Sequence, residues 1–367
     1  MLNNKNIQKI YFLAICGTGM ASLAAMLKDK GYTVYGVDQD VYPPMSTFLQ
    51  DQGIPVYGGW DPGHLESDPD LVIVGNAVSR GNPELEALLN AHIPYMSLPD
   101  ALREFCIRGH RSIVVTGTHG KTTTSSLTAW ILEYAGRSPN FMIGGIPNNF
   151  GRGFQRGDGK EFVLEGDEYD SAYFDKTAKF LHYLPDIGII TSIEFDHADI
   201  YNSLDDIKLA FRRFVNIIPS KGLLVVSHED KNAMQIATYG FCPVVSFGLT
   251  SEADWYAADV GISHNGTEFS VIRNKQVWKR FYIPMYGTHN VKNALAAIIT
   301  ADHVGVAADT ICTALSEFAG IQRRLEHVGT AAGVEIYNDF GHHPTAVHET
   351  LAALRAKYPC QRIWALY

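Results

Sequence analysis

Residues 116–124 read TGTHGKTTT, and they connect a short run of β-branched residues, 112–116, to a stretch with helical periodicity, 122–134. Glycines in a strand-turn-helix connection let backbone N–H groups face a phosphate, and the helix N-terminus adds partial positive charge. In such a loop Lys121 can reach the outer phosphates of a nucleotide, and the Thr122 hydroxyl is placed to bind Mg²⁺. The stretch therefore predicts a nucleotide-binding loop.

The loop departs at one position from the full GxxxxGK[ST] pattern, because Val115 stands where the first glycine is usual. A structural glycine turn followed by a surface lysine is the alternative interpretation. The strand-turn-helix context and the run of threonines favour the nucleotide loop. Its candidate binding residues are Gly117, Thr118, His119, Gly120, Lys121, Thr122 and Thr123.

Two acidic stretches follow later strands of the same predicted sheet. Residues 165–170 read EGDEYD after the apolar run 162–164, and residues 194–199 read EFDHAD after the run 187–193. Ligands of open parallel sheets bind at the carboxyl ends of the strands. Carboxylates at that edge suit Mg²⁺, and a neutral imidazole at His197 could complete a second metal site. Either stretch alone is more typical of a solvated loop, but after a nucleotide loop they predict metal ligation.

Apolar runs of strand length alternate with helical stretches from the start of the chain, over 10–15, 21–30, 32–37 and 71–74. This order predicts an α/β fold with a doubly wound parallel sheet. The first turn, GTGMAS, resembles a dinucleotide fingerprint and predicts a diphosphate at a helix N-terminus, with a purely structural turn as the alternative. The candidate residues at this sheet edge are Gly17, Thr18, Gly19, Met20, Asp38, Asn76 and Ser79.

Polar groups also lie near the last helical stretches. Residues 287–293 read GTHNVKN and begin a predicted helix, 290–304, where their side-chain amides could read a purine edge. N-capping of that helix is the alternative. Residues 339–344 read DFGHHP, and two consecutive histidines point to opposite faces of a strand, so a paired His-His metal site is not expected there.

Composition excludes several classes of protein. The 367 residues carry a formal net charge of -9 and are 46% hydrophobic and 19% charged, which is typical of a globular protein. A net acidic chain has no global electrostatic reason to bind nucleic acid or an anionic membrane. No apolar run approaches the ~20 residues of a membrane span. Five scattered cysteines without a CxxC pair predict reduced thiols and a cytoplasmic protein.

Three domains are expected, over residues 1–108, 109–320 and 321–367. The last of them contains a β-α start, at 334–337 and 345–357, and a predicted strand, 362–367. A parallel α/β domain cannot close its core with these elements alone. We therefore expect the third domain to be cut short in this sequence.

Taken together, these motifs resemble the Mur ligase family, the ATP-dependent amide-forming enzymes of peptidoglycan assembly. TGTHGKTTT is similar to that family's shortened P-loop, and Glu165 and the stretch 194–199 are similar to its metal-binding positions. GTHNVKN (287–293) and RRLEHVG (323–329) are similar to its adenine-side and arginine motifs. DFGHHPT (339–345) is similar to the ribose-side start of its third domain.

The resemblance implies a three-domain α/β architecture: an N-terminal Rossmann-like domain for a UDP-sugar, a central P-loop ATPase-like domain, and the start of a Rossmann-like third domain. It implies ATP and Mg²⁺ as cofactors. Lys121, Glu165 and His197 are then the catalytic candidates, and Thr122, Glu165 and His197 the metal ligands. The nucleotide-side candidates outside the loop are His289, Asn290, Asn293, Arg324 and Asp339.

The same resemblance implies that Asp38 and Asn76 contact the uridine, that the turn from Gly17 to Met20 holds the diphosphate, and that His119 faces the sugar. Some family members carry a carbamoylated lysine after the metal histidine. This chain has Arg212 and Arg213 near that spacing, so no carbamate is expected.

The segments GTGMASLA, VDQDVYPPMS, IVGNAVSRGNPELE and EGDEYDSAYFDK are most similar to one branch of the family. That branch joins UDP-N-acetylmuramate to the murein tripeptide L-alanyl-γ-D-glutamyl-meso-diaminopimelate in peptidoglycan recycling. The branch that adds L-alanine to the same sugar is the first alternative. A non-catalytic protein that binds a nucleotide and a UDP-sugar is the second, and an NAD-dependent dehydrogenase leaves TGTHGKTTT unexplained. A monomer or weak homo-oligomer is expected.

Overall fold

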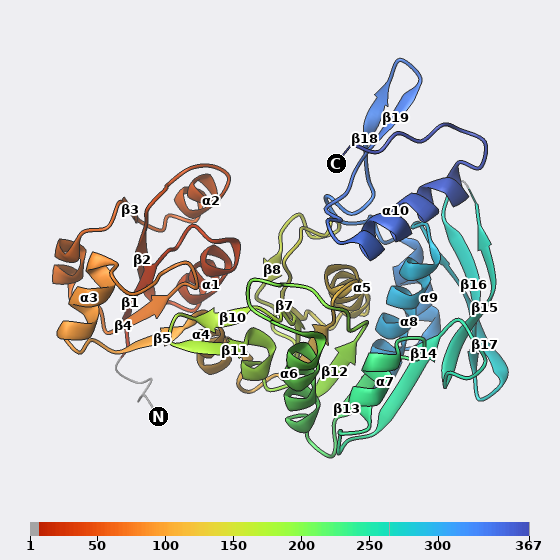
Figure 1. Cartoon of the computed structure of the whole chain (residues 1–367), viewed down its shortest axis with the longest axis horizontal. Helices are drawn as coiled ribbons and strands as arrows, with labels where there is room; N and C mark the ends of the chain where they lie inside the picture. The colour runs from red at the N-terminus through yellow and green to blue at the C-terminus, as the bar shows by residue number, and fades with distance from the viewer. Residues whose placement is uncertain (1–6, 264, 367) are drawn as a thin grey trace. The chain divides into compact units, whose positions relative to one another are not determined.

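The computed structural model describes residues 7–263 and 265–366, which form two compact units (Figure 1). Unit 1 contains the described residues up to His110 together with Asp167–Leu184. Unit 2 contains Arg111–Gly166 and the described residues from Pro185 onward. Each unit is built on its own sheet, and the chain therefore leaves unit 2 once to contribute to unit 1.

Unit 1 has a five-stranded parallel sheet in the order β3-β2-β1-β4-β5. Its central strands are mostly apolar and buried, because a parallel sheet with helices on both faces buries the side chains of its inner strands. All four residues of β4, Leu71–Val74, are buried. The strands are β1 Lys9–Leu13, β2 Thr33–Asp38, β3 Val56–Gly58, β4 Leu71–Val74 and β5 Tyr95–Ser97, and the helices are α1 Thr18–Asp29, α2 Met45–Asp51, α3 Pro83–Asn90 and α4 Leu98–Leu102.

The segment Asp167–Leu184 adds an antiparallel pair to unit 1, β10 Asp170–Ala172 with β11 Asp175–Ala178, followed by a 3-10 turn, Lys179–His182. Its anchor is His182, whose Nδ1 lies 2.9 Å from Asp100 Oδ1 on α4, and whose Nε2 lies 3.1 Å from Asp175 Oδ2. One imidazole ring thus bridges two carboxylates, which attaches the inserted segment to the helix after β5.

Unit 2 has a ten-stranded sheet in the order β17-β16-β15-β14-β13-β12-β6-β9-β7-β8. Along the order β15-β14-β13-β12-β6-β9-β7 every pair of neighbouring strands is parallel. At the two ends of the sheet, β8 pairs antiparallel with β7, β16 with β15, and β17 with β16. The strands are β6 Arg111–Thr116, β7 Asn140–Met142, β8 Phe154–Gln155, β9 Glu161–Glu165, β12 Ile187–Ile190, β13 Leu223–Ser227, β14 Val244–Gly248, β15 Trp255–Ile262, β16 Thr267–Arg273 and β17 Gln276–Ile283.

Helices cover both faces of this sheet. On one face, α5 Lys121–Tyr134, α8 Thr288–His303 and α9 Ala308–Ser316 share an apolar core with alternate strand residues. On the other, α6 Leu204–Asn216 approaches β12 so closely that a Cβ on Gly188 would lie 2.9 Å from the Phe214 ring. The short helix α7 Lys231–Ala237 packs beside α6 and β13. The doubly wound arrangement expected from the alternating pattern is confirmed.

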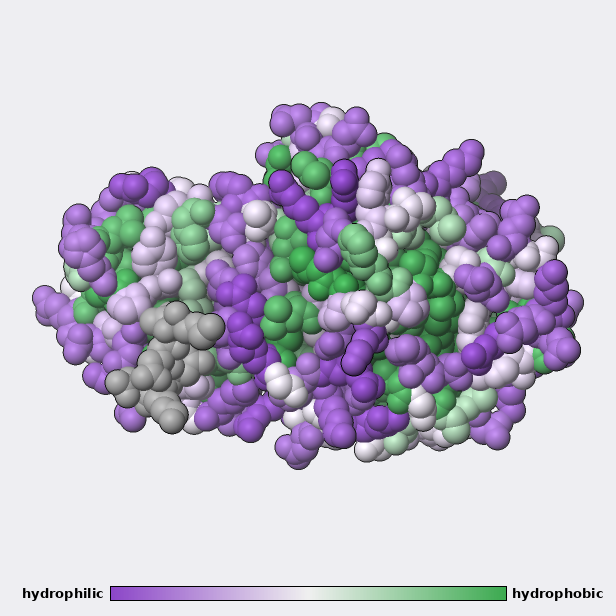
Figure 2. All heavy atoms as spheres, turned by 90° about the horizontal axis from the view of Figure 1, so that it is seen from below, coloured by the Kyte–Doolittle hydropathy of each residue, from purple (hydrophilic) through white to green (hydrophobic). Residues whose placement is uncertain are grey.

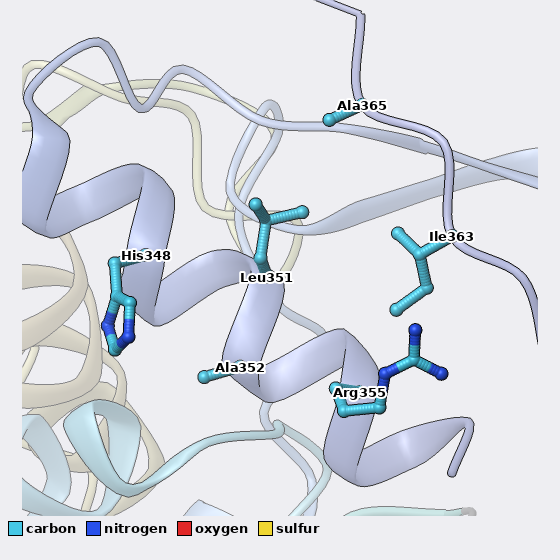
Figure 3. Close-up of a pocket in the computed structure, with 6 residues that line it drawn as sticks. All are labelled: His348, Leu351, Ala352, Arg355, Ile363 and Ala365. Carbon is cyan, nitrogen blue, oxygen red and sulfur yellow. The ribbon is translucent and has the colours of Figure 1, made fainter. Parts of the chain in front are cut away.

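The last region of unit 2, residues 321–366, contains a two-stranded antiparallel ribbon, β18 Glu326–Ala331 and β19 Val334–Asn338, followed by α10 Pro344–Lys357 (Figure 1). The prediction of a strand at 362–367 is wrong over residues 362–366, and Tyr367 lies outside the described residues. Arg355 Nη1 binds the carbonyls of Tyr358, Pro359 and Gln361, so the chain turns after α10 instead of pairing with β19. Between α10 and the segment that follows it lies a pocket, which is lined by His348, Leu351, Ala352, Arg355, Ile363 and Ala365 (Figure 3).

Figure 2 shows hydrophilic side chains over much of one face of the molecule, with apolar side chains between them. Within the described ranges 7–263 and 265–366, no helix is both long enough and apolar enough to cross a lipid bilayer.

Candidate functional site

The turn between β6 and α5 has the backbone of a phosphate-binding loop. Gly117 has φ +126° and Gly120 has φ +80°, in the region that favours glycine. A Cβ on Gly117 would lie 2.1 Å from Thr191 Oγ1 and 2.9 Å from the Ser192 backbone nitrogen. Within the described residues, no side chain caps the N-terminus of α5. Both glycines are therefore required by the loop itself.

Neighbouring backbone holds the loop in place. Thr118 N–H donates to the Ser192 carbonyl at 2.9 Å, and His119 N–H donates to Ser192 Oγ at 3.1 Å. Lys121 folds back over the turn, and its Nζ donates to the Gly117 carbonyl at 2.7 Å. The lysine is thus held beside the N-terminus of α5, where a phosphate would meet both the ammonium and the helix dipole.

Glu165 ends β9 next to this loop, as the sequence predicted. Its Oε1 accepts a hydrogen bond from Thr122 Oγ1 at 2.9 Å, and its Oε2 accepts one from Gly144 N–H at 2.8 Å. Burial raises the pKa of Glu165, although Lys121, the Gly144 amide and Thr122 act in the opposite direction. A carboxylate and a hydroxyl in this position are oxygen ligands suited to Mg²⁺, and a bound cation would offset the cost of burying the charge.

Glu165→Gln is expected to raise the melting temperature of the ligand-free protein near neutral pH. Because the pKa of Glu165 is raised in the folded state, the free energy of unfolding falls as pH rises from the ordinary carboxylate pKa to the folded-state pKa. Above the folded-state pKa the free energy of unfolding stays at this lower value. Glutamine removes the charge, accepts from Gly144 N–H and donates to the Thr122 hydroxyl. Thermal melts at about pH 5 and pH 8 measure the effect, which should be larger at pH 8.

Glu252→Gln is the matched control, because Glu252 lies in the same unit with its side chain 80% exposed. A Glu165→Gln protein that melts below wild type at both pH values would contradict an unfavourable buried charge at this position.

Arg324, from the last region, contacts Thr122 at the start of α5. Its Nη2 donates to Thr122 Oγ1 at 3.3 Å, and its guanidinium lies over the Phe340 ring at 5.5 Å. Asp339 accepts hydrogen bonds from Leu325 N–H and Gly341 N–H, both at 2.7 Å. Asp339 therefore orders the backbone beside Arg324, and this arginine contacts Thr122 at the start of α5.

The asparagines at the start of α8 pack against α5. Asn293 Oδ1 lies 3.3 Å from Thr124 Oγ1, Asn293 Nδ2 donates to Asn290 Oδ1 at 3.2 Å, and Asn290 Nδ2 donates to the Tyr286 carbonyl at 2.8 Å. Both side chains are buried, and a Cβ on Gly120 would lie 2.4 Å from Asn293 Oδ1. Asn293 thus packs against α5 and against Gly120 in the loop before it. His289 Nδ1 lies 3.5 Å from Glu349 Oε2 on α10.

His197 has φ +57°, and its backbone N–H donates to Asp196 Oδ1 at 2.8 Å. Among residues 7–263 and 265–366, two groups of three side chains are close enough together to hold a metal ion: His119 with Glu194 and His343, and Asp100 with Asp175 and His182. His197 belongs to neither. From the acidic stretch 194–199 that the sequence singled out, Glu194 contacts the loop, since its backbone N–H donates to Thr118 Oγ1 at 2.8 Å. The role of His197 as a metal ligand stays a prediction.

The candidates in unit 1 gather at the carboxyl edge of its sheet. Gly17 precedes α1, and the end of β2 is tied to this turn because Asp38 Oδ2 accepts from Cys16 N–H at 2.8 Å. Burial and the nearby Asp38 carboxylate raise the pKa of the Cys16 thiol to about 11. Asn76 follows β4, and the Ser79 carbonyl accepts from Asn82 N–H at 3.2 Å, just before α3.

Sequence reasoning missed the partners that orient Asn76. Its Nδ2 donates to Asp170 Oδ1 at 2.8 Å, and Lys176 Nζ donates to Asp170 Oδ2 at 2.5 Å. Asp170 belongs to the segment 167–184, which we had grouped with the following domain. The EGDEYD stretch thus divides, since Glu165 remains in unit 2 while Asp170 serves unit 1.

Three family descriptions match the chain. "Mur ligase family, catalytic domain" matches residues 9–110, "Mur ligase middle domain" matches residues 115–301, and "Mur ligase, glutamate ligase domain" matches residues 323–367. Together the three matches cover the chain except for residues 1–8, 111–114 and 302–322.

Individual relatives are similar over nearly the whole chain. The UDP-N-acetylmuramate–L-alanyl-γ-D-glutamyl-meso-2,6-diaminoheptandioate ligase of Escherichia coli (strain K12) is 44% identical over 349 residues, covering 95% of this chain and 76% of that protein. The UDP-N-acetylmuramate–L-alanine ligase of Psychrobacter sp. (strain PRwf-1) is 37% identical, covering 99% and 75%. The crystal structure of a murein peptide ligase from Psychrobacter arcticus 273-4 superposes with a TM-score of 0.83 at 38% identity, covering 96% of this chain and 77% of that one.

The nucleotide loop, the acidic strand end beside it and the arginine from the last region thus occur in a chain that matches one family from residue 9 to residue 367. The chain belongs to the Mur ligase family.

Proposed function

We propose that this protein is an ATP-dependent ligase that joins the lactyl carboxylate of UDP-N-acetylmuramate to the amine of L-alanyl-γ-D-glutamyl-meso-diaminopimelate. The observation that carries the proposal is the cluster of Lys121, Thr122, Glu165 and Arg324 at one loop. The 44% identity to the Escherichia coli ligase named for this tripeptide supports the choice of substrate.

The chemistry requires an activated acid, because a carboxylate repels nucleophiles and oxide is a very poor leaving group. Phosphoryl transfer from ATP to the sugar's carboxylate oxygen gives an acyl phosphate and ADP. The α-amine of the peptide then attacks the acyl carbon through a tetrahedral intermediate, loses a proton and expels inorganic phosphate. Catalysis of the first step depends on positioning and on neutralising charge around the transferred phosphoryl group.

Each residue of the cluster meets one of these needs. Lys121 and the first turn of α5 would bind the outer phosphates, and Arg324 would bring a second positive charge from the last region. Thr122 and Glu165 would hold Mg²⁺, which when bound neutralises phosphate charge and fixes the phosphates' orientation. His197, in the stretch after β12, is our proposal for a ligand of a second metal ion near the sugar's carboxylate.

In unit 1 we assign the UDP portion to the carboxyl edge of the sheet. The turn from Gly17 to Met20 at the N-terminus of α1 would bind the diphosphate, since helix N-termini attract anions. Asp38 and Asn76 would contact the uridine, with Ser79 beside them. Asp170 orients the Asn76 amide, because its Oδ1 accepts a hydrogen bond from Asn76 Nδ2. We also propose that the domains close around the two substrates before phosphoryl transfer.

The choice of amine distinguishes the proposal from its nearest rival. The purified full chain, supplied with ATP, Mg²⁺ and UDP-N-acetylmuramate, is expected to form ADP with the tripeptide and only slowly with L-alanine. The 37% identity to an L-alanine ligase is the observation that favours the rival. Faster ADP formation with L-alanine would assign the rival activity, and no ADP with either amine would favour a non-catalytic binding protein.

A further inference from the structure

A second constellation of side chains lies beside the nucleotide loop, and the mechanism does not use it as a unit. His119 belongs to the loop, Glu194 follows β12, and His343 precedes the first turn of α10. One ligand atom from each of the three lies within 4.8 Å of the others. Three segments separated by 75 and 149 residues in the sequence therefore converge on one point.

The spacing of these atoms matches the ligand spacing of a tetrahedral metal centre. His119 Nε2 lies 3.3 Å from Glu194 Oε2, and His343 Nδ1 lies 3.7 Å from the same oxygen. Zinc binds imidazole nitrogen and carboxylate oxygen at about 2.0–2.2 Å, so that tetrahedral ligands lie about 3.4 Å apart. Charged hydrogen-bonded pairs are shorter, at about 2.7–2.9 Å.

The surroundings of the ligands also suit a cation. Thr345 Oγ1 donates to Glu194 Oε2 at 2.8 Å, which is the kind of outer hydrogen bond that holds a ligating carboxylate in place. His343 Nδ1 accepts from Thr345 N–H at 3.2 Å, and a metal would replace that weak cap.

We propose that His119, Glu194 and His343 form a binding site for a transition-metal cation of the Zn²⁺ class, with a fourth position open to water. Two imidazoles and one carboxylate select Zn²⁺ or Co²⁺ over Mg²⁺, which prefers an all-oxygen shell. A cation there would attach the N-terminus of α10 to the nucleotide loop at His119, which lies two residues before Lys121. It would therefore hold the last region against the loop and restrict the motion of both.

Co²⁺ is the probe for this site, because its visible absorption reports tetrahedral coordination. The purified full chain, stripped of metal by a chelator, is titrated with Co²⁺ in the presence of excess Mg²⁺ and without nucleotide. We expect one equivalent to bind with a tetrahedral spectrum, and Zn²⁺ to displace it. His343→Gln and Glu194→Gln should each weaken binding by at least about tenfold, since even outer-shell changes cost 10–100-fold.

His327→Gln is the matched control. His327 lies in the same region, its ring pairs with Glu335, and its side chain is 46% exposed. This variant should bind Co²⁺ as wild type does, and circular dichroism should show all three variants folded. The proposal is overturned if His343→Gln binds as tightly as wild type, if excess Mg²⁺ abolishes the spectrum, or if a sulfur-to-cobalt charge-transfer band identifies a cysteine ligand such as the exposed Cys360. Because the titration contains no ATP, its result is independent of the ligase activity proposed above.

Discussion

Lys121→Ala is expected to lower the rate of ADP formation by about 10²–10³-fold, the usual cost of removing one major charge-stabilising group. Lys121 Nζ is held at 2.7 Å from the Gly117 carbonyl, beside the first turn of α5. Alanine removes the positive charge that would neutralise the transferred phosphoryl group. Binding of the UDP-sugar should stay near the wild-type value, because its proposed contacts are in unit 1. Steady-state ADP release and calorimetry with UDP-N-acetylmuramate measure the two quantities.

Lys231→Ala is the matched control for this experiment. Lys231 is exposed and is the first residue of α7, as Lys121 is the first residue of α5, and both helices belong to unit 2. The control loses the same charge at the same helix position, without a nucleotide loop. Near wild-type turnover by Lys121→Ala would remove this lysine from the mechanism.

Gly117→Ala is expected to abolish measurable ATP binding and to destabilise unit 2. With φ +126°, an L-residue at this position is strained, and a conformation of this kind costs about 1–3 kcal/mol. The new Cβ would also lie 2.1 Å from Thr191 Oγ1 and 2.9 Å from the Ser192 backbone nitrogen. Thr191 can rotate away, but the backbone that receives the loop's own hydrogen bonds cannot. Calorimetry with ATP and a thermal melt measure the two effects.

Gly136→Ala separates backbone strain from the crowding of the loop. Gly136 follows the other end of α5 with φ +69°, and a Cβ there would meet nothing within 4 Å. We expect a modest fall in melting temperature and unchanged ATP affinity. If Gly117→Ala behaved in the same way as Gly136→Ala, close packing of the loop against residues 191–192 would not be a requirement for binding.

Elements with strong local signals could be predicted from the sequence. The strand over 71–74 is apolar at every position, and its predicted limits are those of β4. The turn around Lys121 could also be predicted, because glycines and a helix N-terminus determine the backbone over only a few residues. The strand expected at 362–367 failed because a strand needs a partner, and Arg355 turns the chain elsewhere.

No local feature of the sequence indicates that Glu165 belongs to unit 2 and Asp170 to unit 1. Both lie in one acidic stretch, but Glu165 closes a strand of the large sheet, whereas Asp170 begins the hairpin that joins unit 1. The choice depends on contacts between His182, Asp175 and Asp100, and Asp100 lies on α4, far from the other two in the sequence. Similarly, the contact of Asn293 Oδ1 with Thr124 Oγ1 had no local signal, because it joins α8 to α5 across 169 residues of sequence.

By itself, the order of residues determined the alternation of strands and helices, the phosphate-type loop and the acidic strand end, since burial pattern and backbone sterics are properties of short segments. Only the tertiary structure decided that Glu194 and His343 meet His119 and that Arg324 reaches Thr122. These contacts link residues that are distant in the chain, and their distances depend on which strands pair and how the helices pack between them.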